Sequence, residues 1–320
     1  MSVRARILVV RPYGIGNAIL ATPAMQLCRH LRPDASLEAF LDPLGAETLG
    51  RWPVLDRVHL YPDVPDPAAF ERIVLLEPSS PKVSAPFIDH PGLVRHWLGA
   101  RRSARFLRQH EVEVNLELAG MLAPGQEHPA FPLHCAVTEP AADAMPAPGT
   151  LGVSIGGMQP QQLAKRFAPE FWIELLGPIA AVRPVLLVGG PGEAAEAERI
   201  AKAVGARSVC GTMPLVATAG VIRRCAAFVG TDGGMMHVAA CVGTPVVGLF
   251  SATDPWRSRP WAPIGRAIVV KLERTPSPSS IHQVGRALEA LEHGRSEWLT
   301  FAGDSVRLRR PARLWRRARR

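Results

Sequence analysis

The sequence is poor in cysteine and has no long hydrophobic run. Its five cysteines are scattered and odd in number, with no CxxC pair, which excludes a disulfide framework and a zinc knuckle. No stretch of 18 apolar residues occurs, so no segment is expected to span a membrane. The apolar run near the start breaks at Arg11-Pro12 without a small-residue cleavage site, which argues against a signal peptide. We therefore expect a cytoplasmic protein.

Charged residues are also somewhat scarce, at 20% of the chain against a usual value of ~25%. The net charge is nevertheless +9, because residues 307–320 contain eight arginines and no acid. The rest of the chain is almost neutral, which argues against a folded surface built to hold nucleic acid. The apolar fraction of 47% is large enough for hydrophobic cores and excludes disorder of the whole chain.

Short β-branched runs alternate with longer helical stretches, a pattern typical of βαβ units and parallel sheets. In the first half this pattern predicts strands at 6–10, 37–41, 57–60 and 73–76, a helix at 17–31, a loop at 77–92 and a helix over 93–110. In the second half it predicts strands at 152–155, 185–188, 227–229, 246–250 and 267–270, with helices at about 169–182, 193–204, 215–225, 234–242 and 280–292.

The two series predict an α/β protein with two doubly wound, Rossmann-like domains that face a central cleft. The segment 139–150 is rich in Pro and Ala and reads as a connection between them. The expected division is an N-terminal domain at 1–140, a linker at 141–150, a C-terminal domain at 151–302 and a basic tail at 303–320. Ligands of such sheets bind outside the carboxyl ends of the strands, so functional residues are expected in the loops that follow strands.

The first such loop reads Arg11-Pro12-Tyr13-Gly14-Ile15-Gly16-Asn17 and opens a helix. Backbone N–H groups at a helix start favour an anion, which makes Gly14 and Gly16 candidate binding residues. Ile19 stands where a G-x-G-x-x-G fingerprint has its third glycine, and no Gly-Lys-Ser/Thr follows, so neither nucleotide motif is present. Taken alone, the turn is better explained as a tight strand-to-helix connection than as a binding site.

The segment Thr231-Asp232-Gly233-Gly234-Met235-Met236-His237 carries more information. Gly233 and Gly234 leave backbone N–H groups uncovered at a helix start, which suits a diphosphate. Asp232 is a candidate helix cap, and His237 faces either the ligand or the core. The combination of both residues with a double glycine at a strand end favours a binding site over a cap and a core histidine.

Three further loops are expected at the same edge of this sheet. Thr253 and Asp254 follow the next strand. Lys165 lies after the first strand of the second domain, where it can meet a phosphate as a point charge, although a single lysine is more commonly just exposed. Glu193 ends a glycine turn at a position where it can accept a ribose hydroxyl.

Several kinds of site are missing from the sequence. The histidines show no metal-ligand spacing, so no metal site is expected; they include His90, His96, His110, His128 and His134. There is also no Ser-His-Asp order and no G-x-S-x-G elbow.

Three segments together resemble glycosyltransferase family 9, the ADP-heptose:lipopolysaccharide heptosyltransferases. They are RILVVRPYGIGNAILATPAMQLCRHLRP, the K-R-F…FW segment, and TDGGMMHVAACVGTPVVGLFSATDP. The similarity covers roughly 6–32 and 151–256, and little is recognised between about 40 and 140. The resemblance implies a GT-B fold and inverting transfer that needs neither a metal nor another cofactor, with a nucleotide sugar as substrate.

The resemblance also assigns roles to residues of this chain. Lys165, Gly233 and Gly234 match positions that handle the phosphates, Glu193 lies near the position that meets the ribose, and His237 matches a donor-site histidine. Asp232 and Thr253 belong to the same motif. The expected partners are an ADP-sugar donor and a lipid-linked glycan acceptor.

One position departs from the family. Where the heptosyltransferases have Gly-Asp, with the aspartate as the base that deprotonates the acceptor, this chain has Gly16-Asn17. A carboxamide cannot act as that base, a role that contributes about 10²–10⁴-fold in rate. Either another group such as Asp89 or His90 replaces it, or Asn17 orients the acceptor while leaving-group stabilisation by Lys165 and its neighbours carries the chemistry, or transfer is lost and the protein only binds.

Other readings remain open. An NAD-dependent enzyme is disfavoured because the G-x-G-x-x-G motif is incomplete, whereas a sugar-nucleotide epimerase of the same architecture is not excluded by its fold.

The tail RLRRPARLWRRARR fits an anionic inner-membrane surface, because Leu308, Leu314 and Trp315 offer apolar side chains for insertion beside the arginines. A solvated tail is the simpler alternative. RNA binding is not expected, since Trp315 is the only aromatic residue there.

Overall fold

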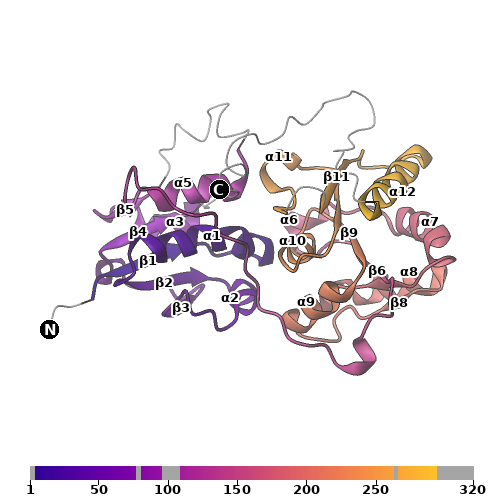
Figure 1. Cartoon of the computed structure of the whole chain (residues 1–320), viewed down its shortest axis with the longest axis horizontal. Helices are drawn as coiled ribbons and strands as arrows, with labels where there is room; N and C mark the ends of the chain where they lie inside the picture. Colours follow the sequence, from indigo (N-terminus) through magenta and orange to yellow (C-terminus); the bar gives the residue numbers. More distant parts are fainter. Residues whose placement is uncertain (1–3, 77–80, 96–108, 263–265, 294–320) are drawn as a thin grey trace. The chain divides into compact units, whose positions relative to one another are not determined.

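The computed structural model describes residues 4–76, 81–95, 109–262 and 266–293. These residues form two compact units that divide between Ala136 and Val137, and Figure 1 shows both. The basic tail expected at 303–320 lies outside the described residues. The segment 141–150, expected as a linker, contains a short 3₁₀ turn, η4 (Ala142–Ala144), and belongs to the second unit.

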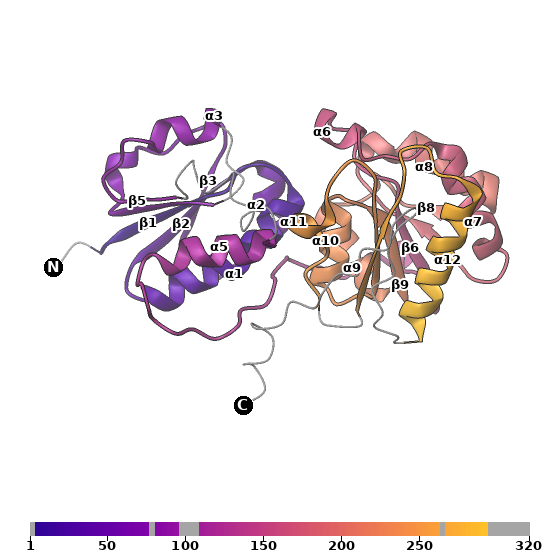
Figure 2. The same ribbon diagram turned by 90° about the horizontal axis from the view of Figure 1, so that it is seen from above.

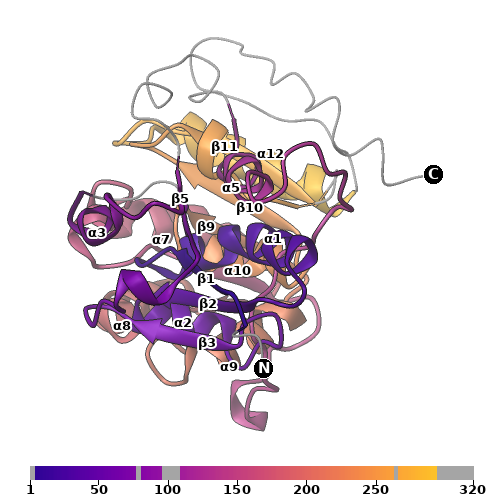
Figure 3. The same cartoon turned by 90° about the vertical axis from the view of Figure 1, so that its left-hand side faces the viewer.

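The first unit is a five-stranded parallel sheet in the order β3-β2-β1-β4-β5. Its strands are β1 (Arg6–Val10), β2 (Ser36–Leu41), β3 (Arg57–Leu60), β4 (Arg72–Leu75) and β5 (Leu93–Val94). Its helices and 3₁₀ turns are α1 (Ile15–Leu31), α2 (Pro43–Leu49), η1 (Pro67–Ala69), α3 (Pro81–Ser84), η2 (Ala85–Phe87) and α5 (Glu111–Gly120). In Figure 3, β3, β2 and β1 follow one another in this order.

Both faces of this sheet are covered because its strands are apolar on both sides. Ile7 and Val9 of β1 pack with α1 and α5, while Leu8 and Val10 pack on the opposite face with Val83 and Phe87. Figure 2 shows α1 and α5 side by side on one face and α3 on the other. Pro23 inside α1 cannot donate a hydrogen bond to the carbonyl of Ile19, and the Thr22 hydroxyl donates to that carbonyl instead, at 2.7 Å.

The helix expected over 93–110 is wrong where the structure describes this segment. Leu93 and Val94 form a strand that pairs with Ile73 and Val74 of β4, and 96–108 lie outside the described residues. The described helix begins one residue later, at Glu111, because the His110 ring accepts the N–H of Val112 as a cap. The loop expected at 77–92 likewise contains the short turns α3 and η2.

The second unit is a six-stranded parallel sheet in the order β11-β10-β9-β6-β7-β8. Its strands are β6 (Leu151–Ser154), β7 (Val185–Leu187), β8 (Arg207–Ser208), β9 (Ala227–Thr231), β10 (Val246–Phe250) and β11 (Ala267–Lys271). Its helices and remaining 3₁₀ turn are α6 (Pro160–Leu163), α7 (Pro169–Ala180), η5 (Pro191–Glu193), α8 (Ala194–Val204), α9 (Leu215–Arg224), α10 (Gly234–Cys241), α11 (Pro255–Ser258) and α12 (Pro278–Glu292).

One hydrophobic core joins this sheet to α7, α8 and α12, with Trp172 fully buried at its centre. Figures 1 and 2 show these helices on one side of the sheet and α9 and α10 on the other. The fold class expected from the sequence, α/β with two Rossmann-like parallel sheets, is confirmed. No helix in the described ranges is long and apolar enough to cross a membrane.

Candidate functional site

Asp232 lies at the centre of a polar cluster at the carboxyl edge of the second sheet. It directly follows β9, its side chain is only 3% exposed, and one of its oxygens, Oδ2, accepts two hydrogen bonds. The Lys165 ammonium donates one at 2.8 Å and the Thr253 hydroxyl donates the other at 2.6 Å. Residues from three loops that are distant in sequence are thus tied to one buried carboxylate.

Lys165 is the cation of this cluster. Its side chain is 20% exposed, so the ammonium meets Asp232 on one side and still reaches solvent. Phe167, two residues later, is buried in the core below α7 and fixes the segment at the sheet edge. Because a lysine has three N–H donors and Asp232 takes one, Lys165 retains donors for a phosphate oxygen.

Gly233 and Gly234 form the start of α10, and no side chain caps that end of the helix. The φ of Gly233 is −163°, which any residue can adopt, and an added Cβ would come no closer than 3.7 Å to its neighbours. The folded chain itself therefore does not require glycine at 233. A bare backbone leaves room for a ligand to approach the first N–H groups of α10.

His237 lies on the same helix, fully buried. Burial lowers the pKa of its imidazole from 6.5 to about 4, with Lys165 adding to the shift and Asp232 opposing it. The ring is consequently neutral at pH 7. Its Nδ1 is buried and has no hydrogen-bond partner among the described residues, which is unusual for a buried polar atom.

Lys271, at the end of β11, was not predicted from the sequence as a site residue. Its ammonium donates to the backbone carbonyls of Ser251 and Thr253, the latter at 2.8 Å. These contacts hold the loop after β10 so that the Thr253 hydroxyl meets Asp232. Burial lowers the pKa of Lys271, while Asp254 and Asp232 raise it. In the sequence it is only a lysine that follows the last expected strand, which does not mark it as a site residue.

Glu193 lies at the end of the turn that follows β7, where the sequence places it. Burial raises the pKa of its carboxyl, against the backbone hydrogen bonds that it accepts. One of these comes from the N–H of Met158 at 3.1 Å. Its other oxygen, Oε2, packs against Gly190: a Cβ atom added to that glycine would lie 3.1 Å from this oxygen. The carboxylate is thereby held against the backbone, in a position to accept a hydroxyl.

The glycine turn of the first unit has a different structure. The N–H of Gly14 donates to Asp42 Oδ2 at 2.9 Å, and the Asn17 amide donates to the carbonyl of Tyr13 at 2.5 Å. Gly16 lies in the first turn of α1. The N–H of Gly14 is thus already bonded within the protein. These three candidates from the sequence lie in the first unit, and the remaining ones lie in the second.

The two groups considered as replacements for a base at position 17 differ in structure. His90 is engaged on both ring nitrogens: Nδ1 accepts the N–H of Gly92 at 3.1 Å, which leaves Nε2 to donate to the carbonyl of Phe70 at 3.0 Å. His90 is therefore a fixed structural group. Asp89 is exposed.

The pKa of His237 predicts how the stability of the second unit depends on pH. In the unfolded chain the imidazole binds a proton near pH 6.5, whereas in the folded chain it does so only near pH 4. The unfolded state therefore holds more protons in this window, so the free energy of unfolding rises with pH across it, by about 3 kcal/mol.

The measurement is urea unfolding between pH 4 and pH 7. His237→Gln should flatten the rise, whereas the matched change His282→Gln, at an exposed position on α12, should leave it in place. An unaltered slope in His237→Gln would contradict the burial of a neutral imidazole.

The described residues contain no group of three His, Cys, Asp or Glu side chains placed to hold a metal ion. The arrangement offers, instead, a fixed lysine, an uncapped helix start, a neutral histidine and a buried carboxylate around one sheet edge. Such a set suits an anionic ligand with attached hydroxyl groups.

One family model and several solved structures are similar to this chain. The model of glycosyltransferase family 9 (heptosyltransferase) matches residues 101–285. A glycosyltransferase of family 9 from Veillonella parvula has 17% sequence identity and a TM-score of 0.71, covering 92% of this chain and 99% of its own. The ADP-heptose lipopolysaccharide heptosyltransferase II of E. coli has 20% identity and a TM-score of 0.67, with coverages of 90% and 98%.

The E. coli heptosyltransferase WaaC, solved with ADP, has 17% identity and a TM-score of 0.64, with coverages of 89% and 99%. The same enzyme was also solved with ADP-2-deoxy-2-fluoro heptose. No curated protein matches the sequence significantly. The fold is thus that of the GT-B heptosyltransferases, with two parallel α/β sheets. Because the family model spans more than half of the sequence, the chain belongs to glycosyltransferase family 9.

Proposed function

We propose that the protein is an inverting, metal-independent glycosyltransferase that moves heptose, or a related sugar, from an ADP-sugar to the lipopolysaccharide core or another glycolipid acceptor. The observation that carries this proposal is the cluster in which Asp232 holds Lys165 and Thr253 beside His237 and the bare start of α10. The solved relatives, which include an ADP-heptose heptosyltransferase and a heptosyltransferase that holds ADP, motivate the choice of donor.

The proposed donor site lies in the second unit. When the bond from the sugar to the diphosphate breaks, negative charge develops on the leaving diphosphate. Lys165 and the first N–H groups of α10 are placed to stabilise that charge, a type of contribution that is commonly the largest in catalysis. Asp232 and Thr253 keep the lysine in position, neutral His237 offers Nδ1 as a hydrogen-bonding group, and Glu193 accepts a ribose hydroxyl.

A second candidate is a family member that binds a nucleotide sugar or glycan without turnover. The observation in its favour is Asn17, whose amide is bound to the carbonyl of Tyr13 and cannot accept a proton. This candidate shares the donor site and differs only on the acceptor side.

The test is a transfer assay with ADP-heptose and a lipid-linked core acceptor that lacks heptose. Our proposal expects the acceptor to gain one sugar while an equal amount of ADP is released, with and without a chelator. Binding of ADP-heptose without any transfer to a series of acceptors would support the second candidate. Failure to bind any nucleotide sugar would contradict both.

We further propose that the enzyme works in the cytoplasm, at the inner membrane, and that residues 304–320 attach it to anionic lipid. Each arginine near such a surface contributes about 1 kcal/mol, so deletion of the segment should abolish co-sedimentation with vesicles that contain phosphatidylglycerol. Neutral phosphatidylcholine vesicles serve as the control for charge. Unchanged binding after the deletion would contradict this role of the tail.

A further inference from the structure

Asp42 ties the first turn of α2 to the glycine turn after β1. It directly follows β2, the neighbour of β1 in the sheet, so both loops leave the same sheet edge. Its Oδ1 accepts the N–H of Gly45 at 2.7 Å and caps α2, while its Oδ2 accepts the N–H of Gly14 at 2.9 Å. A cap needs only the first contact, whereas the second places the carboxylate against the turn that carries Asn17.

Asn17 and Asp42 hold the same peptide group from opposite ends. Asn17 donates to the carbonyl of Tyr13 at 2.5 Å, and Asp42 accepts the N–H of the next residue, Gly14. The φ of Tyr13 is 93°, a conformation that is rare for a bulky residue and that these two contacts maintain. An aspartate at position 17 cannot donate to Tyr13. Asn17 therefore acts as a hydrogen-bond donor in this loop, and the loop's carboxylate comes from position 42.

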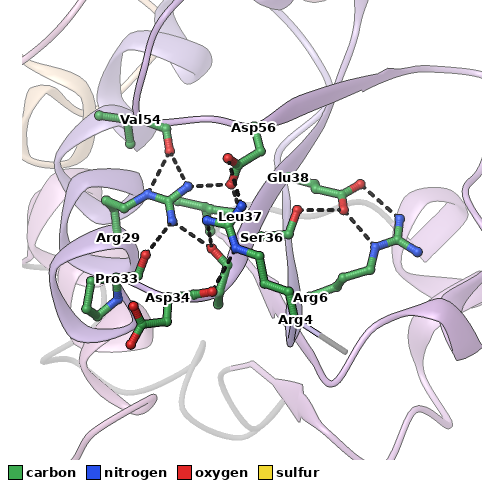
Figure 4. A network of polar contacts seen from close by, with 11 residues as sticks. Arg4, Arg6, Arg29, Pro33, Asp34, Ser36, Leu37, Glu38, Val54 and Asp56 are labelled. Atoms are coloured by element: carbon green, nitrogen blue, oxygen red, sulfur yellow. Dashed lines mark hydrogen bonds and ion pairs between the residues drawn. The ribbon is translucent and has the colours of Figure 1, made fainter. Parts of the chain in front are cut away.

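Two other carboxylates of the first unit, Glu38 and Asp56, are committed to cations. Glu38 pairs with Arg6 and His59, and its pKa is lowered to about 2. Asp56 pairs with Arg29 and Arg4. Figure 4 shows the pairs of Glu38 and Asp56 with these arginines, at the amino ends of β1, β2 and β3, opposite to the glycine turn. A carboxylate held by arginine is a poor proton acceptor.

Asp42 differs from them in both position and partners. Among the described residues it meets two backbone N–H groups and no cation. It is half-buried, so it is neither sealed in the core nor free in solvent. A carboxylate offers about four lone-pair positions. The two hydrogen bonds that Asp42 accepts therefore leave a lone pair on each oxygen that can bind a proton.

We propose that Asp42 is the group that accepts the proton of the acceptor hydroxyl. This inference rests on the proposed transfer reaction. In that step the acceptor oxygen forms a bond to the anomeric carbon, the bond from that carbon to the diphosphate oxygen breaks, and its electron pair leaves with the diphosphate. The hydroxyl proton passes to a carboxylate oxygen of Asp42, and Asn17 keeps the turn beside it in place.

The test compares Asp42→Asn and Asp42→Ala with wild type in the transfer assay. Asn caps helices as well as Asp does, so Asp42→Asn should keep the cap of α2, whereas its amide nitrogen cannot accept the N–H of Gly14. It should lower kcat by about 10²–10⁴-fold, the usual size of a general-base contribution. Its affinity for ADP should be unchanged, because the donor residues lie in the other unit. Added formate should restore part of the activity of Asp42→Ala.

Two other variants complete the design. Asp63→Asn, at an exposed position after the neighbouring strand β3, is the matched control and should keep full activity. Asn17→Asp should not raise the rate, because it loses the bond to Tyr13. An active Asp42→Asn, a folded Asp42→Ala that formate does not rescue, or a large gain in Asn17→Asp would each overturn the assignment.

The outcome also separates this inference from the proposed function. If wild type transfers sugar and Asp42→Asn does so equally well, the result contradicts only the assignment of Asp42 as the proton acceptor. If wild type binds ADP but transfers sugar to no acceptor, the chain has no working base. That result contradicts the role of Asp42 but not the proposed donor site. If wild type neither binds nor transfers, both fall.

Discussion

Lys165→Met is expected to weaken the binding of ADP by roughly 10- to 100-fold. A hydrogen bond between charged groups contributes about 1.5–3 kcal/mol, and each 1.4 kcal/mol corresponds to about tenfold in affinity. Loss of the ammonium also leaves the buried Asp232 carboxylate uncompensated beside the proposed diphosphate position. Calorimetric titration with ADP measures the effect without requiring the acceptor.

The matched control is Lys202→Met. Lys202 lies on α8 in the same unit, its side chain is 76% exposed, and within the described ranges it pairs with Glu198 one helical turn away. This change removes the same charge from the same unit and should leave the ADP affinity within about twofold, since exposed pairs contribute little. Equal affinities for wild type and Lys165→Met would show that Lys165 does not meet the phosphates.

Arg11→Met is expected to destabilise the first unit by about 3–5 kcal/mol. Arg11 follows β1 and pairs with Glu111 at the start of α5, and their side chains are only 1% and 7% exposed. Removing one partner of a buried ion pair typically costs about 3–5 kcal/mol, because the remaining charge stays buried with less compensation. Urea unfolding of the variant measures this loss, which should be accompanied by disorder of the glycine turn.

A double change distinguishes a buried charge from lost packing. When Arg11→Met is combined with Glu111→Leu, both charges of this pair are removed, and much of the lost stability should return. If the double variant is as unstable as the single one, the ion pair is not the reason for the effect. The exposed pair of Lys202 and Glu198 offers a comparison: replacing either residue should lower the free energy of unfolding by no more than about 1 kcal/mol.

Much of the fold follows from local pattern. The runs at 6–10, 57–60 and 246–250 are strands with the same bounds as predicted. Those at 6–10 and 246–250 are almost wholly apolar because a strand in the middle of a covered parallel sheet is buried on both faces, whereas 57–60 forms an edge strand with exposed ends. The helix α5 was missed because its sequence, EVEVNLELAG, alternates polar and apolar residues in the manner of a strand. Its packing against α1, through Val114 and Leu118, decides the outcome, and no local pattern contains that contact.

The donor side could be predicted further than the acceptor side. Lys165, Asp232 and Thr253 each follow a strand or open a helix of one parallel sheet, so topology alone places them at one edge, and the structure joins them through Asp232. Lys271 was missed because its role depends on two backbone carbonyls of another loop. Asp42 was missed for the same reason: its contact with Gly14 joins two loops of neighbouring strands.

The most direct test of this account is a calorimetric titration of the purified protein with ADP-heptose, with UDP-sugars, GDP-sugars and NAD as comparisons. The account predicts saturable binding of ADP-heptose that persists in a chelator, exceeds the binding of the others, and is weakened by Lys165→Met but not by Lys202→Met. An absence of binding to every nucleotide sugar would contradict it, because the edge of the second sheet around Asp232 would then be scaffold and not a donor site.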